Sequence, residues 1–246
     1  MMRRTIVLTV AFFAVCGFSM MSAQHLQPKI SGAAGFPHDS VMTKTFQSTM
    51  TPQQALQRLI EGNNRFLAGK NLQRNYLEAV HQTYKGQYPY AFILSCIDSR
   101  TSPEIIFDQN LGDVFNARIA GNFVNNDILG SMEFACKVAG AKLIVVIGHT
   151  KCGAVKGACD HVQLGNLTSV INEISPAVEM VKDVSGKRSS ENDVFVEAVA
   201  HENVRLAIEE IRDKSPILLE MESKGELLIV GGMYDLKTGK VEFTVK

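Results

Sequence analysis

Two stretches of sequence decide the fold, Tyr90-Ala-Phe-Ile-Leu-Ser-Cys96-Ile-Asp98-Ser-Arg100 and Leu143-Ile-Val-Val-Ile-Gly-His149-Thr-Lys-Cys152. Each begins with a short apolar run that is bounded by polar or glycine residues, a pattern typical of a buried strand in a parallel sheet. Side chains that follow such strands gather at the carboxyl edge of an open α/β sheet. If the two strands lie near each other, we expect Cys96, His149 and Cys152 to meet at that edge.

Two thiolates and one imidazole are typical ligands of zinc, and three protein ligands leave a fourth position open, as catalytic zinc requires. We predict one zinc ion per chain, held by Cys96, His149 and Cys152. Asp98 is placed either to fill the fourth position or to lie beside it. A purely structural zinc closed by Asp98 is the alternative. Ligand pairs about fifty residues apart disfavour it, because structural sites usually come as tightly spaced pairs.

Cys96-x-Asp98-x-Arg100 followed by His149-x-x-Cys152 resembles the β-class carbonic anhydrases. Three neighbouring segments are also similar to that family, Ser99-Arg100-Thr101-Ser102-Pro103-Glu104, Gly112-Asp113-Val114-Phe115-Asn116-Ala117-Arg118 and Val146-Ile147-Gly148-His149. The resemblance extends from about Thr51 to the C-terminus and favours the plant-like, type I branch. The other branch carries a non-catalytic bicarbonate site marked by a tryptophan, and this chain contains no tryptophan.

The resemblance implies a zinc lyase that interconverts carbon dioxide and bicarbonate. Water has a pKa near 15.7, and zinc lowers that of a bound water to about 7, so that a zinc-bound hydroxide attacks the carbon of CO2 at neutral pH. The family's counterpart of Asp98 has two states. It pairs with the counterpart of Arg100 and leaves zinc open, or it binds zinc and closes the site. Asp98 and Arg100 are therefore the candidate catalytic residues, with the resting state left open.

Five residues are candidates for the substrate pocket. By resemblance, Gln87 matches a substrate-side glutamine and Phe115 a pocket aromatic residue. Phe134 lies where the type I branch often has tyrosine, and Ala120 where a larger aliphatic residue is common. Gly153 follows the third zinc ligand, and its N–H at a helix start would favour an anion. Surface or core roles remain alternatives for Gln87, Phe115 and Phe134.

Two other functions stay open beside CO2 hydration. The first is a hydrolase of carbon disulfide or carbonyl sulfide, because some members of the superfamily use the same scaffold for these substrates. The second is a non-catalytic zinc-binding or redox-sensing protein. Assays of both substrate types and of zinc content discriminate between the three functions.

Composition sets broad limits on the class of protein. The chain has 246 residues, which favours one domain of about 200 residues with an appendage. Its formal net charge is zero and 20% of its residues are charged, so nothing indicates binding to nucleic acid. The five cysteines form no repeated CxxC pair, which argues against a disulfide framework.

The N-terminus has the pattern of a secretory signal peptide over residues 1–23. Arg3 and Arg4 precede an apolar run of about sixteen residues, and Ala23 ends a plausible cleavage site. We expect a secreted or periplasmic protein without a membrane segment after cleavage. An uncleaved membrane anchor is the alternative. Residues 24–50 are predicted to be a linker or flexible arm, and residues 51–246 the catalytic domain.

The alternation of strand and helix patterns predicts an α/β fold. We expect a mainly parallel sheet of about four strands plus an edge strand, flanked by helices, with an N-terminal helical arm that starts at Thr51. The expected strands are Tyr90–Ser95, Val114–Ile119, Leu143–Ile147, Leu227–Val230 and Val241–Val245. The longer expected helices are Asp127–Val138, Ser169–Val184 and Asp193–Lys214. By resemblance, the chain forms a homodimer or homotetramer whose pocket lies at a subunit interface.

Overall fold

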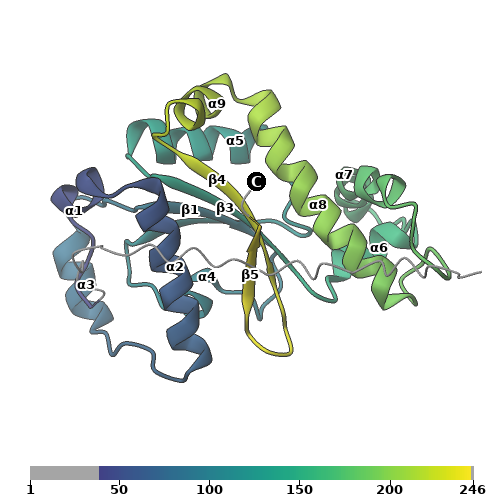
Figure 1. Cartoon of the computed structure of the whole chain (residues 1–246), viewed down its shortest axis with the longest axis horizontal. Coiled ribbons are helices and arrows are strands. Elements are labelled where there is room, and N and C mark those ends of the chain that lie inside the picture. The colour runs from purple at the N-terminus through teal and green to yellow at the C-terminus, as the bar shows by residue number, and fades with distance from the viewer. Residues whose placement is uncertain (1–38, 245–246) are drawn as a thin grey trace, which may run out of the picture. The chain divides into compact units, whose positions relative to one another are not determined.

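The structure of the chain, a computed structural model, describes residues 39–244 (Figure 1). The predicted signal peptide and most of the predicted linker lie outside the described residues. All described residues belong to one compact unit. Within residues 39–244, no helix combines the length and the apolar character that crossing a bilayer requires.

A five-stranded sheet in the order β2-β1-β3-β4-β5 forms the centre of the described chain. The four parallel strands are β1 (Ala91–Ser95), β2 (Val114–Arg118), β3 (Leu143–His149) and β4 (Leu228–Tyr234), and the antiparallel edge strand is β5 (Val241–Thr244). This arrangement confirms the predicted sheet. Parallel pairing aligns the carboxyl ends of β1 and β3, so the residues that follow these strands become neighbours.

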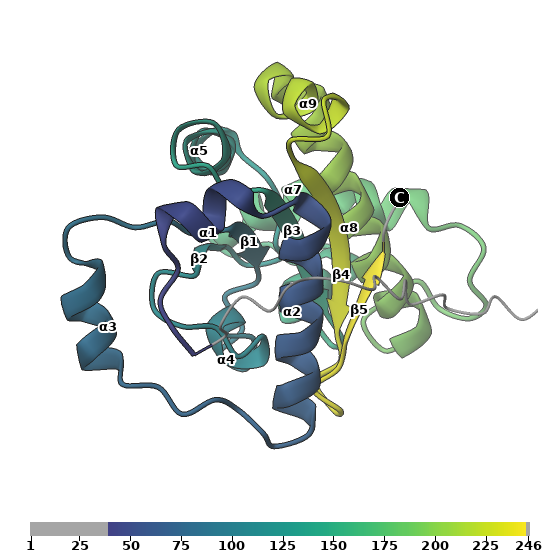
Figure 2. The same cartoon turned by 60° about the vertical axis from the view of Figure 1, so that its left-hand side comes forward.

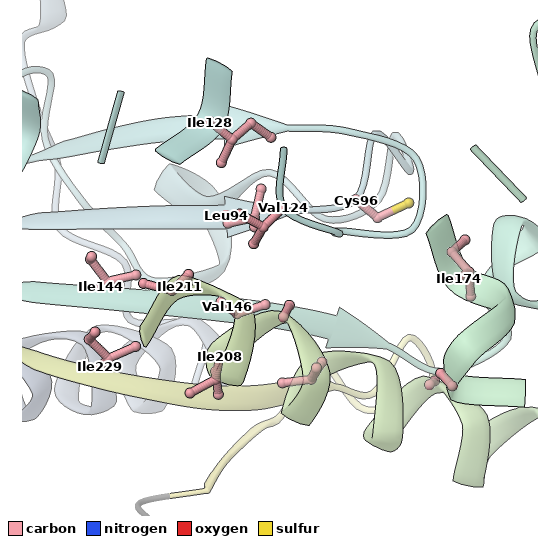
Figure 3. Close-up of a cluster of buried hydrophobic side chains, with 14 of the residues drawn as sticks. Leu94, Cys96, Val124, Ile128, Ile144, Val146, Ile174, Ile208, Ile211 and Ile229 are labelled. Atoms are coloured by element: carbon pink, nitrogen blue, oxygen red, sulfur yellow. The ribbon is translucent and has the colours of Figure 1, made fainter. Parts of the chain in front are cut away.

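Helices cover both faces of the sheet, because successive side chains of a strand point to opposite faces. Ile144 and Val146 of β3 join the larger core cluster, and Leu143 and Val145 join the second cluster on the other face (Figure 3). The larger cluster includes residues of α5 (Asn126–Glu133), η1 (Phe134–Val138), α6 (Gly153–Cys159), α7 (Leu167–Met180), α8 (Asp193–Lys214) and α9 (Pro216–Ser223). The second includes residues of α2 (Pro52–Leu67) and α4 (Pro103–Ile106).

The predicted helix start at Thr51 is confirmed. The Thr51 side chain accepts a hydrogen bond from the Gln54 N–H, and the Gln54 side chain accepts one from the Thr51 N–H, so a capping box begins α2. Ala55 and Leu59 are fully buried against the sheet. Within one chain, α2 thus covers its own sheet.

Two short helices were not expected. Helix α1 (Lys44–Thr49) lies within residues 24–50, which the sequence predicts to be a linker, and the Thr43 side chain caps it. Helix α3 (Tyr76–Thr83), at the left of Figure 2, is the second. It buries Ala79 but exposes Tyr76 and Leu77. Both helices are too short to show a clear apolar period in sequence.

Two predicted helices have different bounds. The helix predicted over Asp127–Val138 continues beyond α5 as a π-helix, in which the Ala139 N–H bonds to the Phe134 carbonyl. The helix predicted to run to Val184 ends at Met180, where the Arg188 side chain donates hydrogen bonds to the carbonyls of Val178 and Val181.

Strand β4 is longer than predicted, because Gly231 and Gly232 resemble a strand end in sequence but continue the ladder with β3. A Cβ atom at Gly231 would lie 2.7 Å from Val204 Cγ1 and 2.8 Å from Thr244 Oγ1. Glycine at this position therefore permits the close packing of α8 and β5 against β4.

Candidate metal centre

Neighbouring strands bring the three predicted ligands together. Cys96 directly follows β1, and His149 is the last residue of β3, which is hydrogen-bonded to β1. Cys152 is the residue at the N-cap position of α6, shortly after His149 in sequence. Their ligand atoms lie within 4.8 Å of one another, and all three residues are buried. The expectation that they meet at the carboxyl edge of the sheet is confirmed.

The distance between the two thiols fits a zinc ion. Cys96 Sγ and Cys152 Sγ lie 3.9 Å apart and form no disulfide. Two sulfur ligands about 2.3 Å from a tetrahedral zinc are about 3.8 Å apart. The pair therefore needs almost no movement to bind the metal.

His149 has the tautomer that zinc requires. Its Nδ1 lies 3.0 Å from the Thr150 carbonyl oxygen. A carbonyl only accepts, so Nδ1 carries the proton and Nε2 has a free lone pair. Among residues 39–244, the buried Nε2 has no hydrogen-bond partner. A buried acceptor without a partner is unfavourable unless a metal or another donor satisfies it.

The protonation states of the two cysteines also indicate that this site binds a cation. The pKa of Cys96 is lowered, chiefly because the Cys152 thiol donates a hydrogen bond to it. The pKa of Cys152 is raised, because it donates to Cys96, is buried and lies beside that thiolate. Without a metal, the site thus favours one thiolate and one thiol. A divalent cation removes this conflict, because it stabilises both thiolates.

Asp98 is paired with Arg100 in this structure. Asp98 Oδ1 accepts hydrogen bonds from Arg100 Nε at 2.9 Å and from the Arg100 backbone N–H at 3.0 Å, and Oδ2 accepts one from Nη2 at 2.8 Å. These bonds hold the pKa of the Asp98 carboxyl well below its usual range. The carboxylate therefore stays ionised beside the three ligands.

Arg118 and Thr101 hold the loop that carries Cys96 and Asp98. Arg118 Nε donates to the Cys96 carbonyl at 3.0 Å, and its Nη2 donates to the Asp98 carbonyl at 2.5 Å. Thr101 Oγ1 donates to the Asp98 carbonyl at 2.9 Å. Neither residue was assigned a role from the sequence. The signal for Arg118 is its place at the end of a strand next to the Cys96 strand.

Two of the five predicted pocket residues lie beside the ligands. Ala120 precedes Gly121, whose N–H donates to Cys96 Sγ at 3.4 Å. Gly153 is the first residue of α6, directly after Cys152, and is exposed. Both therefore border the metal centre of their own chain.

The other three predicted pocket residues lie far from the ligands of the same chain. Gln87 precedes β1, whereas Cys96 follows it, and a five-residue strand is about 17 Å long. Phe115 pairs in register with Phe92, near the amino end of β1. Phe134 lies against Phe115, with their ring centroids 6.3 Å apart. Within one chain, these three residues do not join the metal centre.

A mainly parallel sheet flanked by helices, with a buried Cys–His–Cys group at its carboxyl edge, is the arrangement expected of an α/β zinc protein. A family model described as carbonic anhydrase matches residues 91–241. Carbonic anhydrase 2 of Mycobacterium tuberculosis is 37% identical over 198 residues, which cover 77% of this chain and 91% of that protein.

Solved structures of β-carbonic anhydrases have a similar fold. The β-carbonic anhydrase CafA of Aspergillus fumigatus has 28% sequence identity and a TM-score of 0.60, over 68% of this chain and 81% of that chain. A tetrameric β-carbonic anhydrase of Sordaria macrospora has 23% identity and a TM-score of 0.58, over 76% of this chain and 95% of that one. The latter likeness concerns the fold alone.

The chain belongs to the β-class carbonic anhydrases. It is therefore a zinc enzyme that catalyses the reversible hydration of carbon dioxide to bicarbonate and a proton. Cys96, His149 and Cys152 form a candidate metal site, and their geometry fits the ion.

Proposed function

We propose that Asp98, held by Arg100, orients the water that reacts with CO2. When bound to the three ligands, zinc lowers the pKa of a water to about 7 and so supplies the nucleophile at neutral pH. Asp98 accepts a hydrogen bond from that water and directs the oxygen lone pair toward the carbon of CO2. The observation that carries this role is the forked pairing of Asp98 with Arg100, two residues beyond a ligand.

Arg100 has two effects in this proposal. Its guanidinium donates to both carboxylate oxygens, so it would keep the aspartate from binding a metal held by the three ligands. Its positive charge keeps Asp98 ionised and therefore able to accept a hydrogen bond. The proton released by the reaction leaves to buffer, and the product bicarbonate is replaced by water.

We also propose that a second copy of the chain completes the substrate pocket. Three of the predicted pocket residues lie around the amino ends of β1 and β2, namely Gln87, Phe115 and Phe134. Strand β2 is an edge strand, and the Phe134 side chain of η1 is about half exposed. A two-fold axis beside β2 would bring the amino end of one sheet toward the carboxyl end of the other. The tetrameric structure with a similar fold supports an oligomer of this chain as a dimer or a pair of dimers.

A secreted or periplasmic location is the third part of the proposal. The Arg3-Arg4 pair, the apolar run and Ala23 support it by their pattern. Expression of the full chain followed by cell fractionation tests it. A periplasmic or secreted product that begins near Gln24 agrees with the proposal, and a full-length product in the membrane fraction contradicts it.

The catalytic proposal is tested by assaying CO2 hydration and hydrolysis of carbonyl sulfide side by side. We expect CO2 hydration to dominate, and we expect Asp98→Ala to lose most of this activity while the protein retains its zinc. Full activity of the zinc-loaded variant contradicts the role of Asp98. Carbonyl sulfide hydrolysis without CO2 hydration would contradict the assigned substrate.

A further inference from the structure

Asn203 is a buried amide on an otherwise apolar face of α8. The helix presents Val199, Ala200, Val204 and Ala207 to the core around it, and Asn203 itself is only 4% exposed. An amide in such surroundings is unfavourable unless it is hydrogen-bonded. Its Nδ2 donates to the Gly121 carbonyl at 2.7 Å. The hydrogen bond to Gly121 therefore explains why an amide is tolerated at this buried position.

Gly121 makes a second hydrogen bond, to a metal ligand. Its backbone N–H donates to Cys96 Sγ at 3.4 Å, and the contact is buried. The two peptide groups that flank Gly121 are thus both engaged, one with Cys96 and the other with Asn203. A hydrogen bond to a ligand sulfur stabilises the thiolate form that binds zinc.

The conformation of Gly121 explains why its N–H faces the sulfur. The Asn122 N–H bonds to the Ile119 carbonyl at 3.0 Å, and Gly121 has a φ of 81°, which together describe a type II turn. A type I turn would reverse the Ala120–Gly121 peptide and direct a carbonyl oxygen, in place of the N–H, toward Cys96. A carbonyl oxygen beside a thiolate would repel it. The orientation of the Ala120–Gly121 peptide therefore decides whether its contact with Cys96 Sγ is attractive or repulsive.

Glycine alone fits this position. A Cβ atom at Gly121 would lie 2.3 Å from Ile174 Cδ1, and the positive φ disfavours other residues. Gly121 therefore has little packing of its own to hold it in place beside Cys96. The hydrogen bond from Asn203 holds the Gly121 carbonyl and so fixes the main chain of this residue at the position from which its N–H reaches Cys96 Sγ.

We propose that Asn203 is a positioning residue of the metal centre, which locks the Gly121 turn and thereby keeps an N–H donor on the zinc ligand Cys96. This inference rests on Cys96 being a zinc ligand. Asn203 acts only through Gly121. We therefore expect its loss to weaken zinc binding and to alter the electronic state of the Cys96 thiolate beyond any effect on folding.

The variant Asn203→Ala removes the donor, and Asn203→Asp removes it with almost no change in side-chain volume. We expect both to raise the zinc dissociation constant about 10- to 100-fold in competition with a chromophoric chelator. We also expect the thiolate-to-metal charge-transfer band of the cobalt-substituted protein to shift. The matched control is Ile211→Val, a core change on the same helix away from Cys96 (Figure 3), which should lower the unfolding free energy but leave zinc affinity and the band unchanged.

The hydrogen bond to Cys96 can also be measured directly. In the cadmium-113 form of the wild-type protein, we expect scalar coupling between the metal and the Gly121 amide proton, and we expect Asn203→Asp to abolish it. The proposal is overturned if the Asn203 variants bind zinc within twofold of wild type with an unchanged band, or if the wild type shows no such coupling. A wild-type protein that binds no zinc would instead overturn the proposed function itself.

Discussion

Asp98 and Arg100 form a forked ion pair two residues beyond the metal ligand Cys96, with Nε–Oδ1 and Nη2–Oδ2 distances of 2.9 and 2.8 Å. Arg100 is mostly exposed, and Asp98 is largely buried at the ligand edge of the sheet. An ion pair whose cationic partner is exposed to solvent contributes little to stability. Its geometry is therefore better explained by the orientation of the carboxylate than by the stability of the fold.

Replacing Asp98 should separate catalysis from metal binding. We expect Asp98→Asn to retain zinc but to lower kcat about 10²- to 10³-fold, because the amide replaces two ionised oxygen acceptors with one neutral oxygen and an NH2 donor. Stopped-flow CO2 hydration and zinc analysis of the same sample measure both effects. Asp183→Asn, a change of an exposed carboxylate, is the matched control and should leave both values unchanged. Loss of zinc from Asp98→Asn would contradict the separation.

The fork of Arg100, rather than its charge alone, should be important for activity. A lysine provides a single ammonium group and cannot pair with both carboxylate oxygens. We expect Arg100→Lys to be about tenfold less active and Arg100→Met to be less active still, with an unchanged thermal midpoint, since the residue is exposed. Activity assays with thermal denaturation measure this series. Equal activity of the lysine variant and the wild type would refute the requirement for a fork.

Asp108 should be one of the main contributors to stability outside the metal centre. Its carboxylate is buried and accepts hydrogen bonds from Arg65 Nε and Arg74 Nη1, both at 2.5 Å. We expect Asp108→Asn to lower the unfolding free energy by about 3 kcal/mol at neutral pH, because it removes one member of a buried charge cluster. Asn tolerates the positive φ of 47° at this position, so the backbone conformation should be the same in the wild type and the variant.

The pH dependence of the same variant has a definite sign. Burial raises the pKa of Asp108, but the hydrogen bonds from Arg74 and Arg65 outweigh it, so the folded pKa is lowered. The contribution of the carboxylate is therefore complete above the unfolded value near 4 and is lost as pH falls through the lower folded value. Urea denaturation of metal-free wild type and variant should give a difference that is largest at neutral pH and shrinks in acid. A difference that grows in acid would contradict the direction of the shift.

A composite pocket predicts complementation between two inactive variants. His149→Ala disables the metal centre, and the double variant Phe115→Ala/Phe134→Ala disables the aromatic cluster. If the cluster serves the metal centre of a second copy, a mixed oligomer contains some pockets with both parts intact. We expect co-expressed, doubly tagged mixed oligomers to regain a substantial share of wild-type activity.

The control for complementation is a mixed oligomer of His149→Ala with Asp98→Asn. Both changes lie at the same end of the sheet, so every zinc-competent centre lacks its aspartate, and activity should stay low. Recovery in this control would show that the assay reports something other than a shared pocket. No recovery in the test pair would contradict the composite site.

The strands and the ligand residues of the metal centre were predictable because local patterns determine them. Apolar runs before Cys96 and His149 predicted two strands, and the structure shows that β1 and β3 pair in parallel, which places both residues at one edge. The resemblance to a family added the pairing of Asp98 with Arg100. The structure then showed which of the two expected states of Asp98 it holds.

The supporting contacts were not predictable, because they join residues that are far apart in sequence. Asn203 bonds to Gly121 across 82 positions, and Arg118 bonds to Cys96 across 22. Arg118 ends a segment that is similar to the family but was assigned no role there, and Asn203 stands in no such segment. For Asn203, the available signal is a polar residue on the apolar side of an amphipathic helix. That signal indicates a buried hydrogen bond but does not identify its partner.

The most direct test is stopped-flow CO2 hydration by zinc-analysed protein that begins at Gln24, together with its His149→Ala variant, from neutral to mildly alkaline pH. We expect the wild type to hold one zinc per chain and to hydrate CO2 with a rate that rises with pH. We expect the variant to lose both zinc and activity. A wild type with one zinc per chain and no hydration above the uncatalysed rate would contradict the assignment of this centre as the catalytic site.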